Sequence, residues 1–259
     1  MPSRAARVLL GLWVALVLLF LFGPLAIIAV YAFNASNIQT WPIPGFSTKW
    51  FGSAWANREI RAALVLSLEA GVIATAIAVV LGTSAAFAVH RFRFIGREAV
   101  SFVVVLPIAL PGIITGMALN SFFTLWGVGL SFWTIVIGHA TFCIVVVYNQ
   151  VLARLRRMSA SFSEVSMDLG ADTWRTFRLV TFPMISTALI AGALLAFALS
   201  FDEVIVTTFT AGAQNTLPLW IFGAIRLGQR LPEVNVVVLT VTAITFVPVL
   251  VAYRFMQRS

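Results

Sequence analysis

The stretch of residues 100–153 contains no Asp, Glu, Lys or Arg and is more than twice as long as one membrane crossing requires. A transmembrane helix needs roughly 20 apolar residues to span about 30 Å of hydrocarbon. In the whole chain 61% of residues are hydrophobic and 10% are charged. Soluble proteins carry about 25% charged residues. We therefore expect a polytopic membrane protein, and the composition excludes a water-soluble fold, a disordered chain and a disulfide scaffold.

Apolar segments divide the chain into six predicted spans. Residues 126–131 split the long uncharged stretch, because they hold two glycines suited to a tight turn. The segments lack the alternation of membrane strands, so helices are predicted. The expected fold is an all-α membrane protein with a single transmembrane domain over residues 1–259. Its six transmembrane helices are predicted at about residues 8–33, 62–89, 100–125, 132–153, 184–209 and 234–253.

The basic residues predict how these spans are oriented. The formal net charge is +8 and the sequence pI is about 11.2, but the arginines form short clusters between apolar runs, which favours membrane topology over nucleic-acid binding. Both termini are predicted in the cytoplasm, because the cytoplasmic side then holds most basic residues. The basic residues left outside are Lys49, Arg58, Arg61, Arg226 and Arg230.

The inner loop between spans four and five, residues 154–183, is much longer than the other inner loop. Ser161 and Glu164 have the spacing of a capping box, and Gly170 permits a left-handed helix stop. Asp172 can cap a second short helix. The sequence thus predicts a helix–turn–helix facing the cytoplasm, which could pass force from a soluble partner to span five.

This loop carries a family resemblance. The run Glu-Val-Ser-Met-Asp-Leu-Gly-Ala at residues 164–171, followed by Val-Thr-Phe-Pro at 180–183, resembles the EAA loop of ABC-importer permeases. It departs from that pattern at Val165 and Ser166, which replace two alanines, and at Val180 and Phe182. The resemblance implies a coupling helix that docks on an ATPase subunit. The coupling residues would be Glu164, Val165, Ser166, Asp168, Leu169, Gly170 and Ala171.

Further segments resemble the spermidine/putrescine permease family, second-subunit type. They are residues 106–116, 139–142, 200–209, 217–218 and 232–235. The resemblance implies a type I ABC-importer permease in the bacterial inner membrane that moves polyamines by alternating access. It implies as partners two copies of an ATPase, a second permease subunit and a periplasmic substrate-binding protein. A permease for another small amine or amino-acid-like solute is the alternative.

Three carboxylates are candidates for the translocation path. Asp202 and Glu203 lie roughly 28 Å along a helix from Pro183, in the outer part of span five. Ionisable groups at that depth usually face a cavity or a partner. A cation path and a structural salt bridge to an arginine both satisfy this, and adjacent helical residues point in different directions. Glu69 in span two is a further path carboxylate, a hydrogen-bonded packing residue or a partner for Arg58 or Arg61.

Other residues are predicted to be structural. Pro107 and Pro111 kink span three, and Pro183 begins span five. Gly112 and Gly116 permit close helix approach, either within the subunit or at a subunit interface. His139 is predicted to be an interhelical hydrogen-bond donor.

Sequence motifs for enzymatic chemistry are missing. A P-loop needs a lysine before Ser or Thr, but Lys49, the only lysine, precedes Trp50. There is no catalytic triad, zinc motif or cysteine cluster, so we predict no catalytic residue, metal or cofactor, and ATP hydrolysis by a separate subunit. A secondary transporter without ATP would need an internal repeat. Residues 1–130 and 131–259 share no obvious motif.

Overall fold

The computed structural model describes residues 3–92, 94–159 and 161–256, with side chains up to residue 245. The described residues form helices and the loops between them, and an isolated β-bridge joins Asn34 to Phe46. The chain divides into two compact units, one of Met1–Arg61 with Ile221–Ser259 and the other of Ala62–Trp220.

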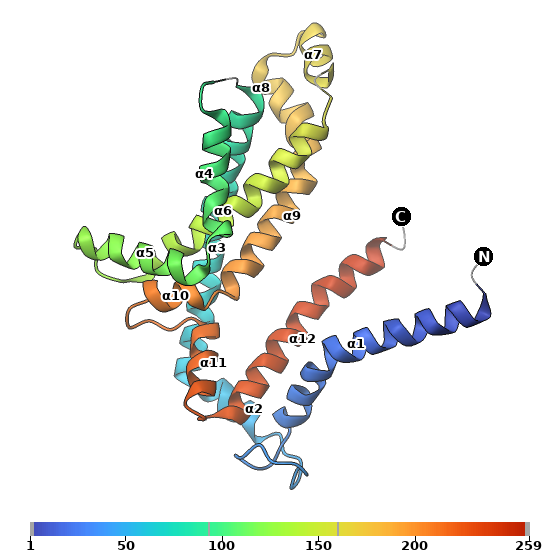
Figure 1. Ribbon diagram of the computed structural model, residues 1–259, viewed down its shortest axis with the longest axis vertical. Helices are drawn as coiled ribbons and strands as arrows, with labels where there is room; N and C mark the ends of the chain where they lie inside the picture. Colours follow the sequence, from blue (N-terminus) through green and yellow to red (C-terminus); the bar gives the residue numbers. More distant parts are fainter. Residues whose placement is uncertain (1–2, 93, 160, 257–259) are drawn as a thin grey trace. The chain divides into compact units, whose positions relative to one another are not determined.

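The first unit is built on three helices, α1 (Arg4–Ala32), α2 (Lys49–Ala56) and α12 (Leu231–Met256). Helix α12 lies beside α1 and also contacts α2 (Figure 1). Ser3 caps α1, because its side chain accepts a hydrogen bond from the Ala6 amide at 3.2 Å. In the apolar 18-residue stretch of α1, 0% of the residues are buried. This helix therefore presents its side chains to whatever surrounds the protein.

The second unit holds most of the helices. Two of them cross the division between the units, α3 (Arg58–Arg91) and α11 (Leu217–Arg226). The others are α4 (Arg97–Ala109), α5 (Gly112–Leu125), α6 (Phe132–Arg157), α7 (Ser161–Asp168), α8 (Thr173–Thr176), the π-helix η1 (Phe177–Thr181), α9 (Phe182–Phe201) and α10 (Ile205–Thr210).

Helix α6 is the centre of this unit, and 67% of the residues in its apolar 18-residue stretch are buried. It runs beside α9 (Figure 1), and small residues let its neighbours approach closely. At Gly82 on α3, a Cβ atom would lie 2.8 Å from the Ile144 carbonyl oxygen. The fully buried residues on α6 include Cys143, Tyr148 and Val151. The core thus forms where α3 and α9 pack against α6.

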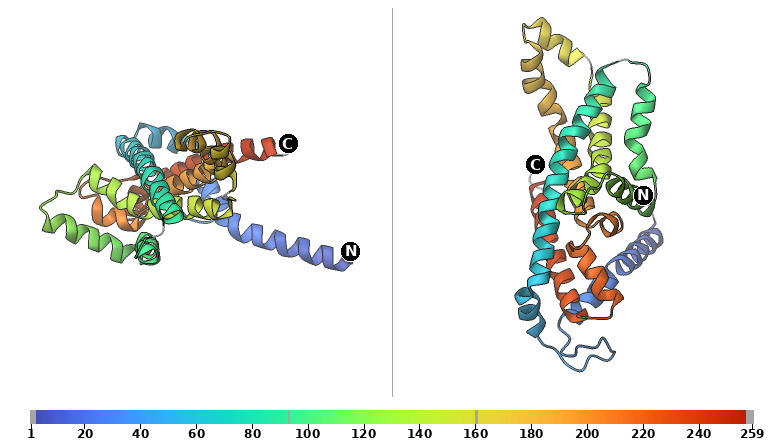
Figure 2. Two further views of the ribbon diagram at one scale, coloured as in Figure 1. Left: turned by 90° about the horizontal axis from the view of Figure 1, so that it is seen from above. Right: turned by 90° about the vertical axis from the view of Figure 1, so that its left-hand side faces the viewer.

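The predicted third span is not one helix. Helices α4 and α5 meet at an angle of 106° (Figures 1 and 2). The break lies at Leu110, whose ψ of 143° is extended, directly before Pro111. A proline disfavours helical backbone in the residue before it, which accounts for the position of the break. The break lies at the prolines where a kink was predicted. Residues 100–125 are thus two helices and not one, and their assignment to a single span stays a prediction.

The predicted fifth span also differs. Helix α9 ends at Phe201, and α10 restarts at Ile205, so residues 184–209 are not one continuous helix. At the other end, helical structure runs without a break from Thr173 to Phe201. The second short helix expected in the inner loop begins at Thr173 as α8, and it continues through η1 into α9 without a break.

Four helices in the described part of the chain are long and apolar enough to cross a membrane, or five if the bent pair α4 and α5 counts as one span. They are Arg4–Ala32, Arg58–Arg91, Phe132–Arg157 and Thr173–Phe201. The portion of α12 with described side chains, Leu231–Thr245, is apolar but shorter. The count of six spans therefore stays a prediction.

Candidate functional site

The break between α9 and α10 is the first candidate site. Residues 202–204 are not helical, although the Asp202 amide still donates to the Ala198 carbonyl at 3.2 Å. Irregular backbone within a membrane must be buried in protein or line a water-filled cavity, because lipid offers its polar groups no partner. A break in an apolar span therefore marks a place where the chain itself, or a cavity, must supply hydrogen bonds.

Glu203 uses its carboxylate inside the chain. Its Oε1 atom accepts a hydrogen bond from the Val206 amide at 2.8 Å, so the side chain caps the first turn of α10. Free amides and a partial positive charge at a helix start favour such an acceptor. The Glu203 side chain is half-buried. This carboxylate therefore stabilises the start of α10.

Threonine hydroxyls add hydrogen bonds to carbonyl groups at the start of α10. Thr207 donates to the Glu203 carbonyl at 2.7 Å, and Thr208 donates to the Val204 carbonyl at 2.8 Å. Each hydroxyl reaches back to the residue four positions earlier, as serine and threonine commonly do in helices. The first turn of α10 is therefore closed by side chains at both its amide and carbonyl groups.

His139 on α6 contacts both sides of the break. Its Nδ1 lies 2.7 Å from Ser200 Oγ on α9, and its Nε2 lies 2.8 Å from Thr207 Oγ1 on α10. All three side chains are buried. The structure thus gives His139 two interhelical hydrogen bonds, where the sequence predicted a donor without naming its partners.

Helix α5 packs against α10 in the same unit. Asn120 Nδ2 donates to the Phe209 carbonyl at 2.7 Å. A Cβ atom at Gly116 would lie 2.6 Å from the Phe209 ring, whereas one at Gly112 would lie 3.6 Å from Ile205. Both glycines therefore face α10, and Gly116 in particular has no room for a side chain. This contact is within the subunit, which is one of the two alternatives that the sequence left open.

Asp202 differs from its neighbour. Its side chain is exposed, and among the residues that the structure describes it makes no ion pair. Glu69 on α3 is likewise exposed, and within the same described ranges it pairs with neither Arg58 nor Arg61. The two carboxylates are thus available to solutes or other chains, whereas Glu203 is engaged within its own chain.

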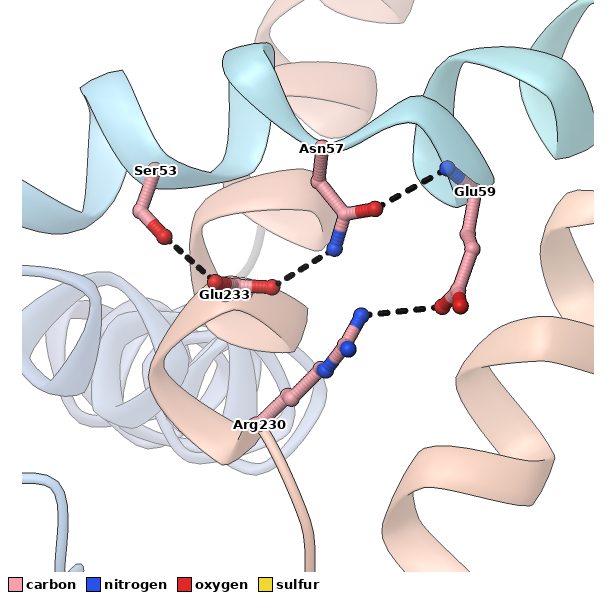
Figure 3. Close-up of polar contacts among 5 residues, drawn as sticks. All are labelled: Ser53, Asn57, Glu59, Arg230 and Glu233. Carbon is pink, nitrogen blue, oxygen red and sulfur yellow. Dashed lines mark hydrogen bonds and ion pairs between the residues drawn. The ribbon is translucent and has the colours of Figure 1, made fainter.

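A second polar cluster in the first unit was not predicted (Figure 3). Glu233, in the first turn of α12, accepts hydrogen bonds at both carboxylate oxygens, from Ser53 Oγ and from Asn57 Nδ2, the latter at 3.1 Å. Asn57 Oδ1 in turn accepts from the Glu59 amide at 2.9 Å, and Glu59 pairs with Arg230 at 2.9 Å. We call these five residues the outer cluster. It joins α2 to the start of α12.

Sequence signals for part of the outer cluster were present. Asn57 directly precedes α3 with Glu59 two residues on, a spacing at which an asparagine side chain commonly accepts from the backbone. Glu233 lies in the first turn of a helix, where acidic residues are favoured. Neither signal pairs the two segments, which lie 176 residues apart.

The inner loop is the second candidate site. Helix α7 ends at Asp168, and Gly170 has φ of 84°, the left-handed stop that the sequence predicts. Asp172 caps the next turn by accepting from the Arg175 amide at 2.7 Å, also as predicted. Ser161 is the first residue of α7 and its amide donates to Ser159 Oγ at 3.3 Å, so the predicted bond from Ser161 to Glu164 is wrong.

The surface of this loop is unusually apolar. Leu169 is 84% exposed, and Phe162 and Val165 are each 53% exposed. These residues fall at i, i+3 and i+7, which places them on one face of the helical segment and its last turn. Glu164 and Asp168 are exposed as well. An exposed apolar face beside acidic residues has the character of a protein contact.

A cavity of about 500 Å³ separates α7 from the ends of α3 and α6. Glu164 lines it from α7, while His90 and Arg91 line it from α3. The predicted coupling residues of α7 therefore stand apart from the spans and are held mainly through α8 and η1.

The remaining residues singled out in the sequence lie within helices or at their starts. Pro107 lies inside α4, Pro111 precedes α5, and Pro183 lies at the start of α9. Cys143 is buried and its thiol donates to the Ala196 carbonyl. Over the described ranges no group of His, Cys, Asp or Glu residues could hold a metal ion.

Comparison with known proteins adds a family. The family model described as "Binding-protein-dependent transport system inner membrane component" matches residues 78–259. The chain is 34% identical to the putrescine transport system permease protein PotI of Escherichia coli (strain K12), covering 100% of this chain and 92% of that protein. It is 32% identical to the spermidine/putrescine transport system permease protein PotC of the same strain, over 94% and 92% of the two chains.

One solved structure has a similar fold. The chain aligns with a chain of a bacterial ABC transporter involved in the import of the acidic polysaccharide alginate, with a TM-score of 0.71. The alignment covers 100% of this chain and 98% of that chain at 16% sequence identity. At this identity the likeness supports the fold, and it agrees with the all-α architecture predicted from the sequence.

Proposed function

The chain belongs to the family of binding-protein-dependent transport system inner membrane components, and from that premise we propose that it is the permease subunit of an importer that moves putrescine or spermidine. The names of its relatives PotI and PotC support a polyamine as substrate. A relative at 28% identity, a putative 2-aminoethylphosphonate transport system permease protein PhnV of Salmonella paratyphi A, keeps another small amine as the alternative.

The observation that favours a cationic substrate is the exposed carboxylate of Asp202. A polyamine is a flexible polycation, which needs acceptors that replace its water as it crosses the membrane. The exposed Asp202 carboxylate lies at a break in an apolar span, where a cavity can reach the backbone. Glu203 is less suited to this role because α10 already uses its carboxylate. We assign Asp202 to the translocation path and Glu203 to the fold.

Helix α7 is the proposed coupling helix. Its exposed apolar face, with Leu169 at its tip, would dock on one of two ATPase subunits. The continuous helical path from Thr173 to Phe201 would then carry a movement of the loop to the break beside Asp202. Closure of the ATPases on nucleotide would draw the coupling helices together and reorient the spans, which is alternating access.

The remaining features of the proposal follow from topology. Six spans with both termini in the cytoplasm would make half of a translocation pathway. A second, related permease would supply the other half, and a periplasmic binding protein would deliver the substrate. The excess of arginine in the predicted inner loops supports this orientation.

The test starts with a tagged chain purified in mild detergent from its host. We expect a P-loop ATPase and a second permease to accompany it. In proteoliposomes, this complex with its binding protein should take up radiolabelled putrescine only when ATP is present on the side of the membrane that holds the ATPase subunits. Uptake that proceeds without ATP or an ATPase would indicate a secondary transporter instead.

Asp202→Asn tests the proposed path. The variant removes the charge but keeps the shape of the side chain, and we expect putrescine uptake to fall about tenfold, the effect of about 1.4 kcal/mol. Glu203→Gln is the matched control, because glutamine Oε1 can still accept from the Val206 amide. Equal uptake by the Asp202 variant and the native protein would assign Asp202 to structure.

A further inference from the structure

The two sides of the break in span five are joined through another helix. Ser200 lies in the last turn of α9 and Thr207 in the first turns of α10, with residues 202–204 between them. The His139 imidazole contacts both hydroxyls, one with each ring nitrogen. The His139 side chain is 1% exposed, Ser200 is 2% and Thr207 is 0%. No solvent therefore competes for these bonds in the folded chain.

The hydrogen-bond directions select one form of the imidazole. Thr207 has a single hydroxyl proton, which it donates to the Glu203 carbonyl. Thr207 Oγ1 must therefore accept a hydrogen bond from His139 Nε2 at 2.8 Å. His139 Nδ1 is then the acceptor for the Ser200 hydroxyl at 2.7 Å. A neutral imidazole with its proton on Nε2 satisfies every group in this chain of bonds.

The face of α6 around His139 is shaped for the same contact. At Gly138 a Cβ atom would lie 3.2 Å from Val206 and 3.3 Å from Thr210, so glycine lets α10 approach α6 closely. One turn further along, the Cys143 thiol donates to the Ala196 carbonyl of α9 at 3.2 Å. Both sides of the break thus rest on one rigid, buried helix.

We propose that His139 is a positioning residue for transport: by bonding Ser200 and Thr207 it holds the break open and fixes where Asp202 stands in the translocation path. The proposal rests on the proposed function, because Asp202 is the residue that it positions. Without the imidazole, two buried hydroxyls lose a partner and the two sides of the break lose their common support. Residues 202–204 could then close into helix, which satisfies its own backbone bonds and withdraws position 202.

The first experiment measures putrescine uptake by the reconstituted complex. For His139→Leu we expect the maximal rate to fall about tenfold at an unchanged KM, because a buried polar group without its partner carries a cost of that order. His139→Gln should recover part of the rate, since its amide can still donate to Thr207. Thr141→Val is the control on the same helix, because the Thr141 hydroxyl only bonds the Ile137 carbonyl of its own turn.

A double variant separates positioning from general stability. If His139 acts through Asp202, the combination of His139→Leu with Asp202→Asn should be no slower than the slower single variant. Losses that multiply would overturn the proposal, as would native uptake by His139→Leu. A defect in Asp202→Asn with a normal His139→Leu would overturn this inference and leave the proposed function standing.

A labelling experiment tests the position of residue 202 whichever solute is carried. Cys143 is the only cysteine, so Cys143→Ala gives a background in which Asp202→Cys is the sole thiol. We expect His139→Leu to slow the reaction of that thiol with a charged methanethiosulfonate reagent about tenfold, by withdrawal of position 202. An unchanged rate overturns the proposal, and this result does not depend on polyamines being the substrate.

Discussion

In the break of span five, the polar side chains from Ser200 to Thr210 other than Asp202 find partners inside the chain, whereas α7 and the turn after it leave large apolar side chains uncovered. Glu203, Thr207 and Thr208 each make a local hydrogen bond, and His139 joins the two sides. Leu169 and Val165 on the loop have no such cover. The difference suggests a general expectation: changes to the internally packed and bonded residues should lower stability, and changes to the uncovered side chains should impair transport in a stable protein.

Gly170→Val should have the largest effect and would sharpen this comparison most. Valine in left-handed backbone costs about 1–2 kcal/mol, and here the cost would be relieved by distorting the end of α7. We expect putrescine uptake to be abolished while the protein remains in the membrane. Gly96→Val is the matched control, because Gly96 in the other inner loop has φ of 89° and equally open surroundings. Equal loss of uptake in the two variants would refute the assignment of α7.

Leu169→Ser tests the uncovered region through its surface. If an ATPase buries this side chain, its loss weakens docking by about 1.5–3 kcal/mol, at least a tenfold change in affinity. We expect less ATPase to copurify, with an unchanged melting temperature in detergent. Ile95→Ser is the control, since Ile95 is also fully exposed in an inner loop. Equal ATPase recovery from both variants would break the comparison.

Gly82→Ala tests the packed region by crowding. The added methyl group would lie 2.8 Å from the Ile144 carbonyl oxygen and 3.0 Å from the Tyr148 nitrogen, both backbone atoms. We expect the free energy of unfolding to fall by about 1–3 kcal/mol, seen as a lower melting temperature. Gly11→Ala, which meets nothing within 4 Å, should instead be neutral or stabilising. Similar melting temperatures for both variants would contradict the close approach of α3 and α6.

Glu233→Gln extends the comparison to the outer cluster with a smaller effect. Glutamine has one acceptor oxygen where glutamate has two and carries no charge, so the bonds that Ser53 and Asn57 donate to a carboxylate cannot both be kept. We expect a loss of about 1–2 kcal/mol in stability, measured by thermal unfolding in detergent. Glu59→Gln is the control, because the exposed Glu59–Arg230 pair contributes at most about 1 kcal/mol. A larger loss at Glu59 would show that the ion pair, not Glu233, holds α2 to α12.

Local chemistry made several features of the fold predictable. Hydropathy located the apolar segments, Pro111 placed the kink between α4 and α5, and Gly170 and Asp172 marked the turn after α7. Each of these depends on a residue and its immediate neighbours. The size of the bend, 106°, was not predictable, because it depends on what α5 packs against.

The break in span five shows where sequence reasoning stops. Residues 202–204 include neither proline nor glycine, so no local signal ends α9 there. The break is supported by His139, distant in sequence, and by Gly138, which admits α10. The outer cluster was missed for the same reason, since Ser53 and Glu233 meet only in the folded chain. What the sequence did predict was the pair of carboxylates, without the difference between them.

The π-helix η1 sets the angular phase between the inner loop and span five. A π-turn holds more residues than an α-turn, so the five residues Phe177–Thr181 turn the chain by less than five α-helical residues would. Each residue of an α-helix turns the chain by about 100° and advances it by about 1.5 Å. If η1 were to tighten into α-helix, α7 would swing around the axis of α9 without any bend in the span. The chain thus contains a joint that converts a change of helical winding into a rotation of the end that carries α7.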